Sequence, residues 1–382
     1  MTPPIRLLYV RDTLTICGPG KTILNTYRTI DRSRFELTVA ATRPAASGNN
    51  ALLDALNALG APTVPFAIGG GIDLGAVWRL VRLIRERKID ILQTHDAQTR
   101  RLGVLAAAIT GVRHVTSVHG WIFNDRKQQT AKWIDARLIG LADRAIAVSG
   151  RLGEELTAAG VPASRLTVVR NAVLLGDYGS KGSGEAVRAE FNIPRDHRVI
   201  SIIGRISAEK GHEVFLAAAK RILERHPKTT FMIVGDGPLR ARVGEAAQEL
   251  GIASHVVFTG HRAKTHDIYG ATDVIVISSF TEGIPNVLLE AYAYEMPAVA
   301  TDVGGVGEVM QDGVSGWLVQ PGDPEIIADK VNGLLADDNL RERMGRAGRL
   351  AMEHRHNFER RTRVVEELYD SLMAGEPAFR PA

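Results

Sequence analysis

Short apolar runs alternate with amphipathic stretches along nearly the whole chain. The runs are rich in β-branched residues, as in Val-Ile-Val-Ile at 274–277, and such runs predict buried strands of a parallel sheet. The predicted strands form two series, the first at 5–10, 36–41, 62–66, 89–93, 113–118, 144–148 and 166–169 and the second at 198–203, 229–234, 255–258, 273–277, 297–300 and 316–319. Helical periodicity fills the intervals, for instance at 21–30, 74–88, 98–110 and 151–159.

One stretch rich in glycine and serine separates the two series. Residues 177–184 read Asp-Tyr-Gly-Ser-Lys-Gly-Ser-Gly, a composition typical of a flexible linker. Two β/α series joined by a linker predict an α/β fold with two Rossmann-like, doubly wound domains that face a deep cleft. We assign the N-terminal domain to 1–176 and the C-terminal domain to 185–357. We predict a final helix at 358–374, which is placed so that it can cross back to the N-terminal domain.

The stretch 278–291, directly after the predicted strand 273–277, is the most informative part of the chain. Gly283 permits a sharp turn, and Pro285 suits the first position of a helix because proline has no amide hydrogen. The helix then opens at the C-terminal end of a strand, where open α/β sheets bind their ligands. Its unpaired amide groups and positive dipole end predict an anion site.

Two carboxylates bracket this turn. Glu282 precedes the helix and Glu290 follows eight positions later, which at the rise of a helix separates them by roughly 8–12 Å. The nucleophile and acid/base of a retaining glycoside hydrolase lie about 5 Å apart. The pair therefore suits two contacts with different parts of an extended ligand. Two isolated glutamates would more commonly be surface residues, but the strand–turn–helix setting favours ligand binding.

Two cations follow the predicted strand 198–203. Arg205 and Lys210 lie in one loop at the C-terminal edge of the sheet. An arginine offers a bidentate fork and a lysine a compact charge, which together suit a diphosphate. The alternative is a solvated loop with two exposed cations, and the neighbouring anion site favours the diphosphate.

A glycine-rich segment follows the first strand. Gly18 and Gly20 allow backbone amides to approach a phosphate closely. A P-loop is excluded because Thr15 occupies the position where that motif requires glycine. The choice between a ligand-cradling loop and a plain turn stays open.

A histidine ends the predicted strand 113–118. At the C-terminal end of a parallel strand, the neutral imidazole of His119 can accept a proton from a hydroxyl group. The alternative is a histidine hydrogen-bonded to the backbone at the sheet edge. His95, after the strand 89–93, is a second candidate with the same two interpretations.

Composition narrows the function class. The single cysteine, Cys17, excludes an intrachain disulfide and suggests a reducing, cytoplasmic compartment. We find no spaced Cys/His set, no His-Glu-x-x-His and no Gly-x-Ser-x-Gly, so no motif supports a metal site or a serine hydrolase. No apolar run reaches the roughly 18 residues of a membrane span.

Charge is distributed unevenly along the chain. Residues 1–175 hold 23 Lys and Arg against 13 Asp and Glu, whereas the rest of the chain is net negative. The predicted helix 74–88 contributes a cationic face. An excess of positive charge favours anionic partners such as membrane headgroups or a phosphorylated acceptor. Nucleic acid is disfavoured because no recognition motif accompanies the charge.

The stretch from Glu282 to Glu290 resembles the Glu-x7-Glu motif of the retaining glycosyltransferases of family 4, which have the GT-B fold. Arg205 and Lys210, after a glycine at 204, match that family's paired cations. The similarity is dense over 198–322 and looser before it.

The N-terminal half carries weaker matches to the same family. Gly18 and Gly20 occupy its first-loop glycine positions, and His119 resembles its cleft histidine. By this resemblance His119 orients the donor sugar or the acceptor, and the N-terminal domain binds the acceptor.

The resemblance implies retaining, metal-independent transfer of a sugar from a UDP- or GDP-linked donor to an acceptor hydroxyl, with no cofactor. Arg205 and Lys210 would bind the donor diphosphate, and Glu290 the ribose. The sugar would contact Glu282 together with the turn that follows it, namely Gly283, Ile284, Pro285 and Asn286.

Other assignments and partners stay open. A different GT-B enzyme, such as an epimerase or phosphorylase, and a catalytically silent nucleotide-sugar-binding subunit are the alternatives. The acceptor is a lipid-linked saccharide, another glycan or a small molecule. The basic N-terminal half favours an anionic acceptor and peripheral contact with the inner face of the cytoplasmic membrane.

Overall fold

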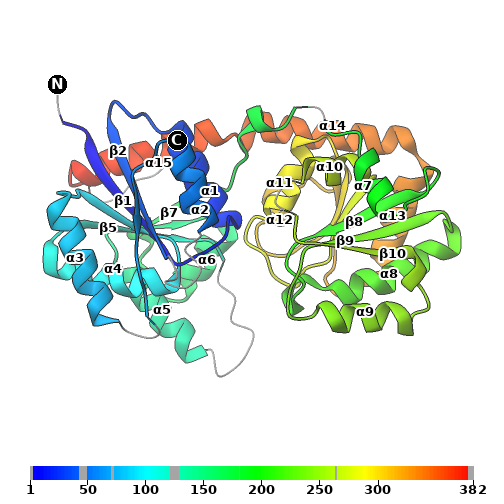
Figure 1. Ribbon diagram of the computed structural model, residues 1–382, viewed down its shortest axis with the longest axis horizontal. Helices are drawn as coiled ribbons and strands as arrows, with labels where there is room; N and C mark the ends of the chain where they lie inside the picture. The colour runs from blue at the N-terminus through cyan, green and yellow to red at the C-terminus, as the bar shows by residue number, and fades with distance from the viewer. Residues whose placement is uncertain are drawn as a thin grey trace. The chain divides into compact units, whose positions relative to one another are not determined.

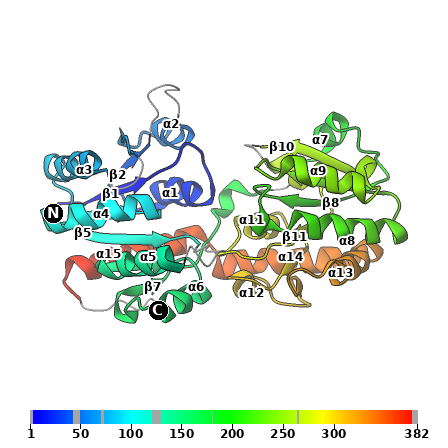
Figure 2. The same cartoon turned by 90° about the horizontal axis from the view of Figure 1, so that it is seen from below.

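The computed structural model describes residues 3–42, 50–69, 73–120, 129–179, 181–262 and 265–376 (Figures 1 and 2). The chain divides into two compact units. The first comprises Met1–Asn171 with Phe358–Ala382, and the second comprises Ala172–Asn357. Each unit is a parallel sheet covered by helices, which confirms the predicted fold class of two Rossmann-like domains.

The first unit contains a seven-stranded sheet in the order β3-β2-β1-β4-β5-β6-β7. Its strands are β1 (Ile5–Arg11), β2 (Phe35–Ala41), β3 (Thr63–Pro65), β4 (Ile91–Thr94), β5 (Arg113–Val118), β6 (Arg144–Ala147) and β7 (Leu166–Val168). Its helices are α1 (Gly18–Thr29), α2 (Ala51–Ala58), α3 (Leu74–Glu86), α4 (Ala97–Thr110), α5 (Gln129–Leu141), α6 (Gly150–Ala158) and α15 (Phe358–Met373). The strand order reverses between β1 and β4, and loops at such a switch point commonly bind ligands.

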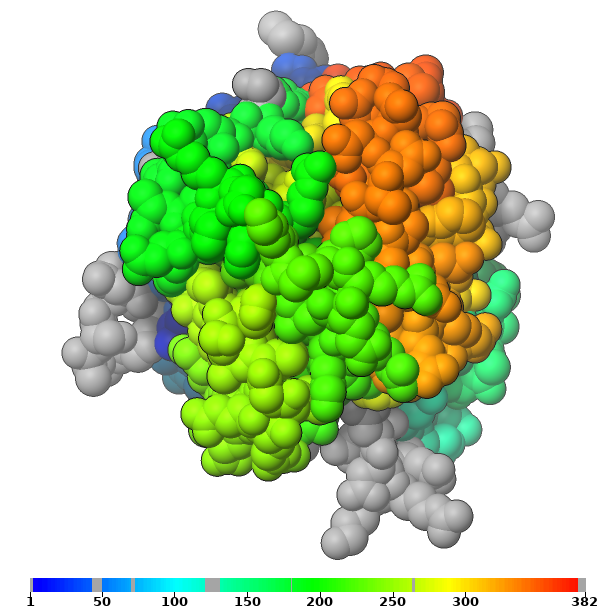
Figure 3. Space-filling model, turned by 90° about the vertical axis from the view of Figure 1, so that its right-hand side faces the viewer, coloured from blue at the N-terminus to red at the C-terminus, as the bar shows by residue number. Residues whose placement is uncertain are grey.

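The second unit contains a six-stranded sheet in the order β10-β9-β8-β11-β12-β13, which reverses between β8 and β11. Its strands are β8 (Arg198–Ile203), β9 (Thr229–Val234), β10 (Val256–Gly260), β11 (Val274–Ile277), β12 (Ala298–Thr301) and β13 (Gly316–Val319). Its helices are α7 (Glu185–Glu190), α8 (His212–Arg225), α9 (Arg240–Glu249), α10 (His266–Ala271), α11 (Asn286–Ala293), α12 (Val306–Val309), α13 (Pro324–Ala336) and α14 (Asp338–Arg355). Figure 3 looks onto the face where α13, in orange, lies beside α8, in green.

The apolar strand β11 is buried on both faces of its sheet. Val274 and Val276 pack into the cluster with α8 and α13, whereas Ile275 and Ile277 pack into the opposite cluster with α11. Successive side chains of a strand point to opposite faces, so a strand covered on both sides must be apolar throughout. The strand therefore ends in a fixed position, and the turn that follows it is held rigidly.

The glycines of the predicted linker 177–184 have a packing role. This segment belongs to the second unit, whose boundary falls after Asn171. Gly184 has a φ of +70°, and an added Cβ atom would lie 2.2 Å from the backbone nitrogen of Ala271 in α10. A side chain at residue 184 would therefore collide with α10. Close approach of two backbones, rather than chain flexibility, explains why glycine stands here.

Helix α15 returns to the first unit and packs against α1. Thr362 and Thr29 share a hydrogen bond of 2.6 Å, and Glu366 accepts one from the amide of Asp31 at 2.8 Å. Tyr369 is fully buried beside Phe35, with 5.9 Å between ring centroids. The end of the chain is thus part of the N-terminal core.

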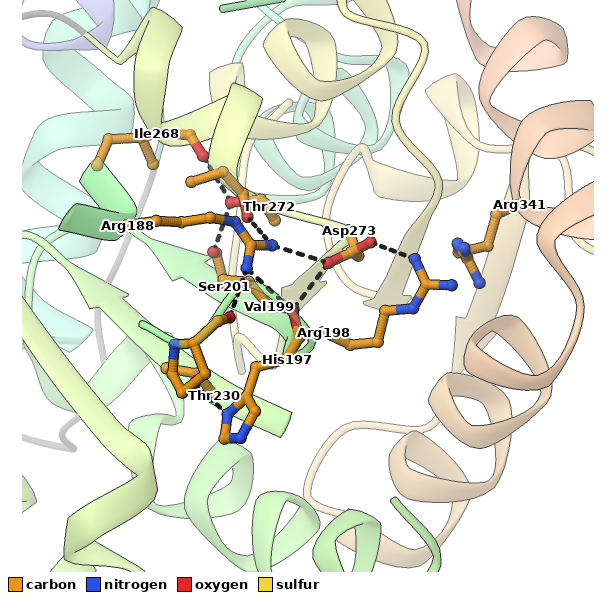
Figure 4. A network of polar contacts seen from close by, with 12 residues as sticks. Arg188, His197, Arg198, Val199, Ser201, Thr230, Ile268, Thr272, Asp273 and Arg341 are labelled. Atoms are coloured by element: carbon orange, nitrogen blue, oxygen red, sulfur yellow. Dashed lines mark hydrogen bonds and ion pairs between the residues drawn. The ribbon is translucent and has the colours of Figure 1, made fainter. Parts of the chain in front are cut away.

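A polar network closes the N-terminal ends of β8 and β11 (Figure 4). The Asp273 carboxylate accepts a hydrogen bond from the amide of Val199 at 2.8 Å and lies 3.0 Å from Arg198. Arg188 of α7 lies 3.6 Å from the same carboxylate and donates to the carbonyl of His197 at 3.0 Å. The network anchors α7 at the opposite end of the sheet from the C-terminal strand ends.

Replacing Asp273 by alanine is expected to lower the free energy of unfolding by about 3 kcal/mol, because two guanidinium groups and a backbone amide lose their common partner. Urea denaturation measures the change. The matched control is Asp196→Ala, which removes an exposed ion pair with Lys228 and should cost less than about 1 kcal/mol. Equal losses in the two variants would contradict an anchoring role for Asp273.

Candidate active site

Lys210 and Glu282 meet at the C-terminal end of the second sheet, beside the switch point between β8 and β11. Lys210 ends the short 3-10 turn Ala208–Lys210 after β8, and Glu282 lies in the turn between β11 and α11. The Lys210 Nζ atom is 2.6 Å from Glu282 Oε1, to which Ser279 Oγ also donates at 2.6 Å. The side chain of Lys210 is 27% exposed and that of Glu282 9%. An ammonium group has three donors, so Lys210 retains capacity for an anion.

Backbone contacts fix the two loops against each other. Ser278 Oγ donates to the carbonyl of Gly211 at 2.9 Å, and the amide of Phe280 donates to the carbonyl of Glu209 at 2.8 Å. Because these bonds flank Lys210 on one loop and Ser279 on the other, the loops that carry Lys210 and Glu282 are held together by more than the charges of those two residues.

The loop after β12 supports the turn that carries Glu282. The amide of Gly305 donates to the carbonyl of Gly283 at 2.6 Å. Gly304 has a φ of +55°, and a Cβ atom there would lie 1.7 Å from the carbonyl oxygen of Glu282. The site thus depends on a close backbone contact that only glycine permits.

Arg205 lies in the same loop as Lys210, but its side chain is exposed and forms no ion pair with the described residues. The loop itself is ordered by neighbouring backbone. The amide of Ile206 donates to the carbonyl of Asp236 at 3.0 Å, and the amide of Leu239 donates to the carbonyl of Ile206 at 3.1 Å. The structure therefore brings Lys210, and not Arg205, into contact with Glu282.

Helix α11 begins one residue later than predicted. Pro285 is the N-cap, with φ −71° and ψ 122°, and Asn286 is the first helical residue. The amide of Leu288 bonds to the carbonyl of Pro285 at 3.1 Å. The amides before Leu288 have no acceptor within the helix. The positive end of the helix therefore lies next to Glu282 and Gly283, as an anion site requires.

Glu290 is buried one turn further into α11. Its exposed fraction is 4%, and Tyr269 of α10 donates a hydrogen bond to Glu290 Oε2 at 3.0 Å. Burial raises the pKa of the Tyr269 hydroxyl well above its ordinary value, and the Glu290 carboxylate raises it further. Tyr269 therefore stays protonated, and its hydroxyl donates a hydrogen bond that fixes the position of the Glu290 carboxylate.

Two family models cover most of the chain. Residues 184–351 match the model described as glycosyl transferases group 1, and residues 16–175 match the model of glycosyltransferase family 4. The alpha-maltose-1-phosphate synthase of Mycolicibacterium smegmatis is 30% identical over 68% of this chain and 73% of its own length. The chain belongs to glycosyltransferase family 4. Its two doubly wound domains are those of the GT-B fold.

A further relative and a solved structure each match this glycosyltransferase along nearly their full lengths. An Escherichia coli enzyme named UDP-Gal:alpha-D-GlcNAc-diphosphoundecaprenol alpha-1,3-galactosyltransferase is 24% identical over 97% of this chain and 98% of its own. The Anabaena protein HepE, solved with UDP and glucose, superposes with a TM-score of 0.85 at 20% identity over 96% of this chain and 100% of its own. The chain spans 98% of the length of the Escherichia coli enzyme but 48% of a D-inositol 3-phosphate glycosyltransferase of Corynebacterium urealyticum.

In the first unit of the glycosyltransferase, His119 lies beside His95 after neighbouring strands. The His95 Nδ1 and His119 Nε2 atoms are 3.2 Å apart, and the rings are stacked with 5.5 Å between centroids. Arg11 donates to the carbonyl of His95 at 3.1 Å and to the Cys17 sulfur at 3.2 Å. Burial holds the pKa of both histidines well below the ordinary value, with Arg11 contributing to both. The two imidazoles are therefore neutral at pH 7.

The glycines after β1 form part of a helix, so neither of the two alternatives left open by the sequence, a ligand-cradling loop or a plain turn, is found there. Helix α1 begins at Gly18, and Gly20 is buried in its first turn. Pro19 explains the early start, because proline fits the first turn of a helix where its missing amide hydrogen costs nothing. Any ligand contact by Gly18 is then made by the helix N-terminus.

Sequence reasoning did not identify Ser279, Tyr269 or Gly304 as parts of the site. Ser279 stands inside the stretch 278–291, three positions before Glu282, and this spacing is the local signal for their contact. The Gly304-Gly305 pair after an apolar run signals a close backbone approach. Nothing near Tyr269 in the sequence points to Glu290.

The described residues contain no group of three or more His, Cys, Asp or Glu side chains placed to hold a metal ion. In the same ranges of the chain, no helix is both long and apolar enough to cross a bilayer.

Acid should destabilise the glycosyltransferase through its buried histidines. Burial lowers the pKa of His114 and of His212 to about 4. In the unfolded chain the value is about 6.5. Above pH 6.5 both states are neutral; between pH 6.5 and 4 only the unfolded state takes up protons. The free energy of unfolding should therefore fall by up to about 1.4 kcal/mol per pH unit for each histidine.

Urea denaturation at several pH values measures this loss. His114→Gln should flatten the dependence between pH 6.5 and 4, whereas the control His354→Gln, at an exposed position, should leave it unchanged. A wild-type stability that stays constant from pH 7 to 4.5 would contradict the assignment of neutral buried histidines.

Proposed function

We propose that this glycosyltransferase moves a sugar from a UDP- or GDP-linked donor to an acceptor hydroxyl with retention of anomeric configuration and without a metal ion. The observation that carries the proposal is the Lys210–Glu282 pair at the N-terminus of α11. It supplies fixed positive charge for a departing diphosphate and a carboxylate for sugar hydroxyls in one turn. The names of the relatives, which include a UDP-galactose enzyme and a protein bound to UDP and glucose, agree with such a donor.

The roles of the second unit follow from the chemistry of transfer. The bond between the anomeric carbon and the diphosphate oxygen breaks, and the electron pair leaves on the phosphate. Lys210 and the first amides of α11 stabilise that charge, which is electrostatics arranged before the reaction starts. Arg205, at the rim of the same loop, is free to bind the diphosphate from the solvent side.

The remaining contacts orient the donor. We assign Glu282, with Gly283, Ile284 and Asn286, to the sugar and the buried Glu290 to the ribose. The acceptor oxygen attacks the face that the diphosphate leaves, and its proton passes to the departing phosphate oxygen. No second carboxylate is needed, which suits a site where Glu290 is hydrogen-bonded to Tyr269.

A panel of nucleotide sugars tests the proposal. A donor present at 100 times its dissociation constant should stabilise the protein by about 2.7 kcal/mol. The stabilising donor is then incubated with acceptors, and the anomeric configuration of the product is read by NMR with and without EDTA. Retention and an unchanged rate in EDTA support the proposal. An inverted product, or a hydrolysed or isomerised donor with no acceptor product, would contradict it.

We propose further that the acceptor is borne on an anionic membrane surface, at the inner face of the cytoplasmic membrane. Helix α4 packs against both α3 and α5, so the three helices form one surface of the first unit. Large apolar side chains are exposed on all of them, for example Trp78 at 60% and Trp133 at 57%. Cations accompany them, namely Arg79, Arg82, Arg85, Arg87, Lys88, Arg101 and Arg137. Aromatic and basic residues together suit a lipid headgroup layer.

Sedimentation with lipid vesicles tests membrane contact. The protein should bind vesicles that contain phosphatidylglycerol and not vesicles of phosphatidylcholine alone, and binding should weaken with salt. Trp78→Ala with Trp133→Ala should reduce binding at least tenfold. The control Leu350→Ala removes an exposed apolar side chain of α14 and should have no effect. Equal binding of both variants would contradict the assigned surface.

A further inference from the structure

A continuous chain of polar side chains crosses the core of the first unit and ends at His119. The Tyr369 hydroxyl of α15 donates to Gln93 Oε1 at 2.5 Å. Gln93 Nε2 lies 3.4 Å from His95 Nε2, and His95 Nδ1 lies 3.2 Å from His119 Nε2. Tyr369, Gln93 and His95 are all at most 3% exposed. The chain connects the C-terminal helix to the loop after β5 through the middle of the sheet.

Each link in this chain has a direction. An amide has one accepting oxygen and one donating nitrogen, so Gln93, whose oxygen receives the Tyr369 hydroxyl, presents its NH2 group to His95. The same NH2 group donates to Ser117 Oγ at 3.0 Å. His95 Nε2 must then be the bare, accepting nitrogen. A neutral imidazole carries a single proton, which therefore sits on His95 Nδ1 and is donated to His119 Nε2.

The same rule fixes the proton of His119. Its Nε2 atom accepts from His95, so its own proton sits on Nδ1. That Nδ1 atom is buried and has no hydrogen-bond partner among the described residues. Two buried arginines, Arg11 and Arg361, add positive potential that disfavours a second proton on either imidazole. A buried N–H group without an acceptor is costly, and a ligand oxygen would remove that cost.

We propose that Gln93 and Tyr369 are positioning residues that fix His119 in the Nδ1–H tautomer, as a hydrogen-bond donor to a hydroxyl oxygen of the substrate. The tautomer follows from the direction of the hydrogen-bond chain and the neutrality of the two imidazoles, whereas the identity of the ligand as a donor or acceptor substrate rests on the proposed function. In this tautomer Nδ1 has no free electron pair, so His119 does not remove a proton from a hydroxyl group through that atom.

The tautomer is read directly by NMR of the full-length protein labelled with nitrogen-15 in its histidines. Protonated and bare ring nitrogens differ widely in chemical shift, and His119→Gln identifies the His119 signals by their loss. At pH 7, without ligand, the expected result is a protonated Nδ1 and a bare Nε2. A protonated Nε2 would overturn the proposal, because the Gln93 amide and the hydrogen bonds that follow it would then have the opposite direction. A cationic ring would overturn it too, because both nitrogens would then carry a proton.

Two variants test the positioning role. Gln93→Glu has the same shape but only acceptor oxygens, so at pH 8 it should draw a proton onto His95 Nε2 and shift the His119 proton from Nδ1 to Nε2. Tyr369→Phe removes the group that orients Gln93 and should give a mixture of tautomers. The control Tyr27→Phe removes a hydroxyl of the same unit outside the chain and should leave the His119 spectrum unchanged. Unaltered His119 signals in both test variants would overturn the role of Gln93 and Tyr369.

Activity separates this inference from the proposed function. Tyr369→Phe should lower kcat/KM for transfer about tenfold while the Kd of UDP, which lacks the sugar, changes less than twofold. If the tautomers behave as expected but the wild type transfers no sugar, the proposed function fails and the hydrogen-bond chain stands. If wild-type transfer is normal but His119 is protonated on Nε2, the inferred direction of the hydrogen-bond chain is wrong and the proposed function stands.

Discussion

Lys210→Ala is expected to lower kcat/KM for sugar transfer by about 100-fold or more, the loss seen when a preorganised group that stabilises developing charge is removed. Lys210 is the cation that the structure places against Glu282, with a side chain that is 27% exposed and donors left over for a phosphate oxygen. Its removal leaves the departing diphosphate with the amides of α11 and the exposed Arg205. The affinity for UDP should weaken in the same variant, because the proposed function assigns the charge of the β-phosphate to Lys210.

The matched control is Lys220→Ala, on the exposed face of α8, ten residues further along the chain. It removes the same charge from the same unit and should leave kcat/KM within a factor of two. Thermal unfolding of both variants shows whether Lys210→Ala has lost activity through unfolding. A folded Lys210→Ala protein with near-normal turnover would refute the role of Lys210.

Gly304→Ala is expected to disrupt the proposed donor site from a position that bears no functional group. A Cβ atom at residue 304 would lie 1.7 Å from the carbonyl oxygen of Glu282, so the Glu282–Gly283 turn must move. The left-handed backbone adds strain for any residue with a side chain. We expect a loss of about 3 kcal/mol in the free energy of unfolding. The Kd of UDP should rise at least tenfold, because the turn holds both Glu282 and the start of α11.

Gly313→Ala separates strain from collision. Gly313 has a φ of +73°, but a Cβ atom there would meet nothing closer than a Trp317 ring carbon at 3.6 Å, an ordinary contact. This control substitution should lower the free energy of unfolding by about 1 kcal/mol and leave the affinity for UDP unchanged. If the two variants lose the same stability and bind UDP equally well, the turn does not depend on the loop after β12.

The strand, turn and helix around Glu282 could be predicted from the sequence because their signals are local. An apolar run, a glycine, a proline and a helical stretch within 274–293 define a strand, a turn and a helix, and the amide groups at a helix N-terminus favour anions. The thirteen predicted strands are confirmed for the same reason: each is a short apolar run between helical stretches.

The contacts within the site could not be predicted, because they join distant parts of the chain. Lys210 and Glu282 are 72 positions apart, and the two are brought together by the pairing of β8 with β11. The hydrogen bond between Gln93 and Tyr369 spans 276 positions and requires α15 to return to the first unit. Local patterns carry no information on such pairings.

Glycine was the residue that local reasoning interpreted least well. Gly18 and Gly20 suggested a loop but belong to α1, because Pro19 favours the first turn of a helix. Gly184 suggested flexibility but allows two backbones to touch, and Gly304 does the same beside the carbonyl of Glu282. The sequence shows only that a glycine lacks a side chain. The fold is needed to show whether the glycine serves backbone flexibility or the close approach of two backbones.

The central claim is that Lys210 and the N-terminus of α11 bind the diphosphate of a nucleotide sugar. A crystal structure of the chain with UDP tests it most directly. The account predicts β-phosphate oxygens within about 3 Å of Lys210 Nζ and of the first amides of α11. UDP bound elsewhere, with Lys210 still bonded only to Glu282, would contradict it.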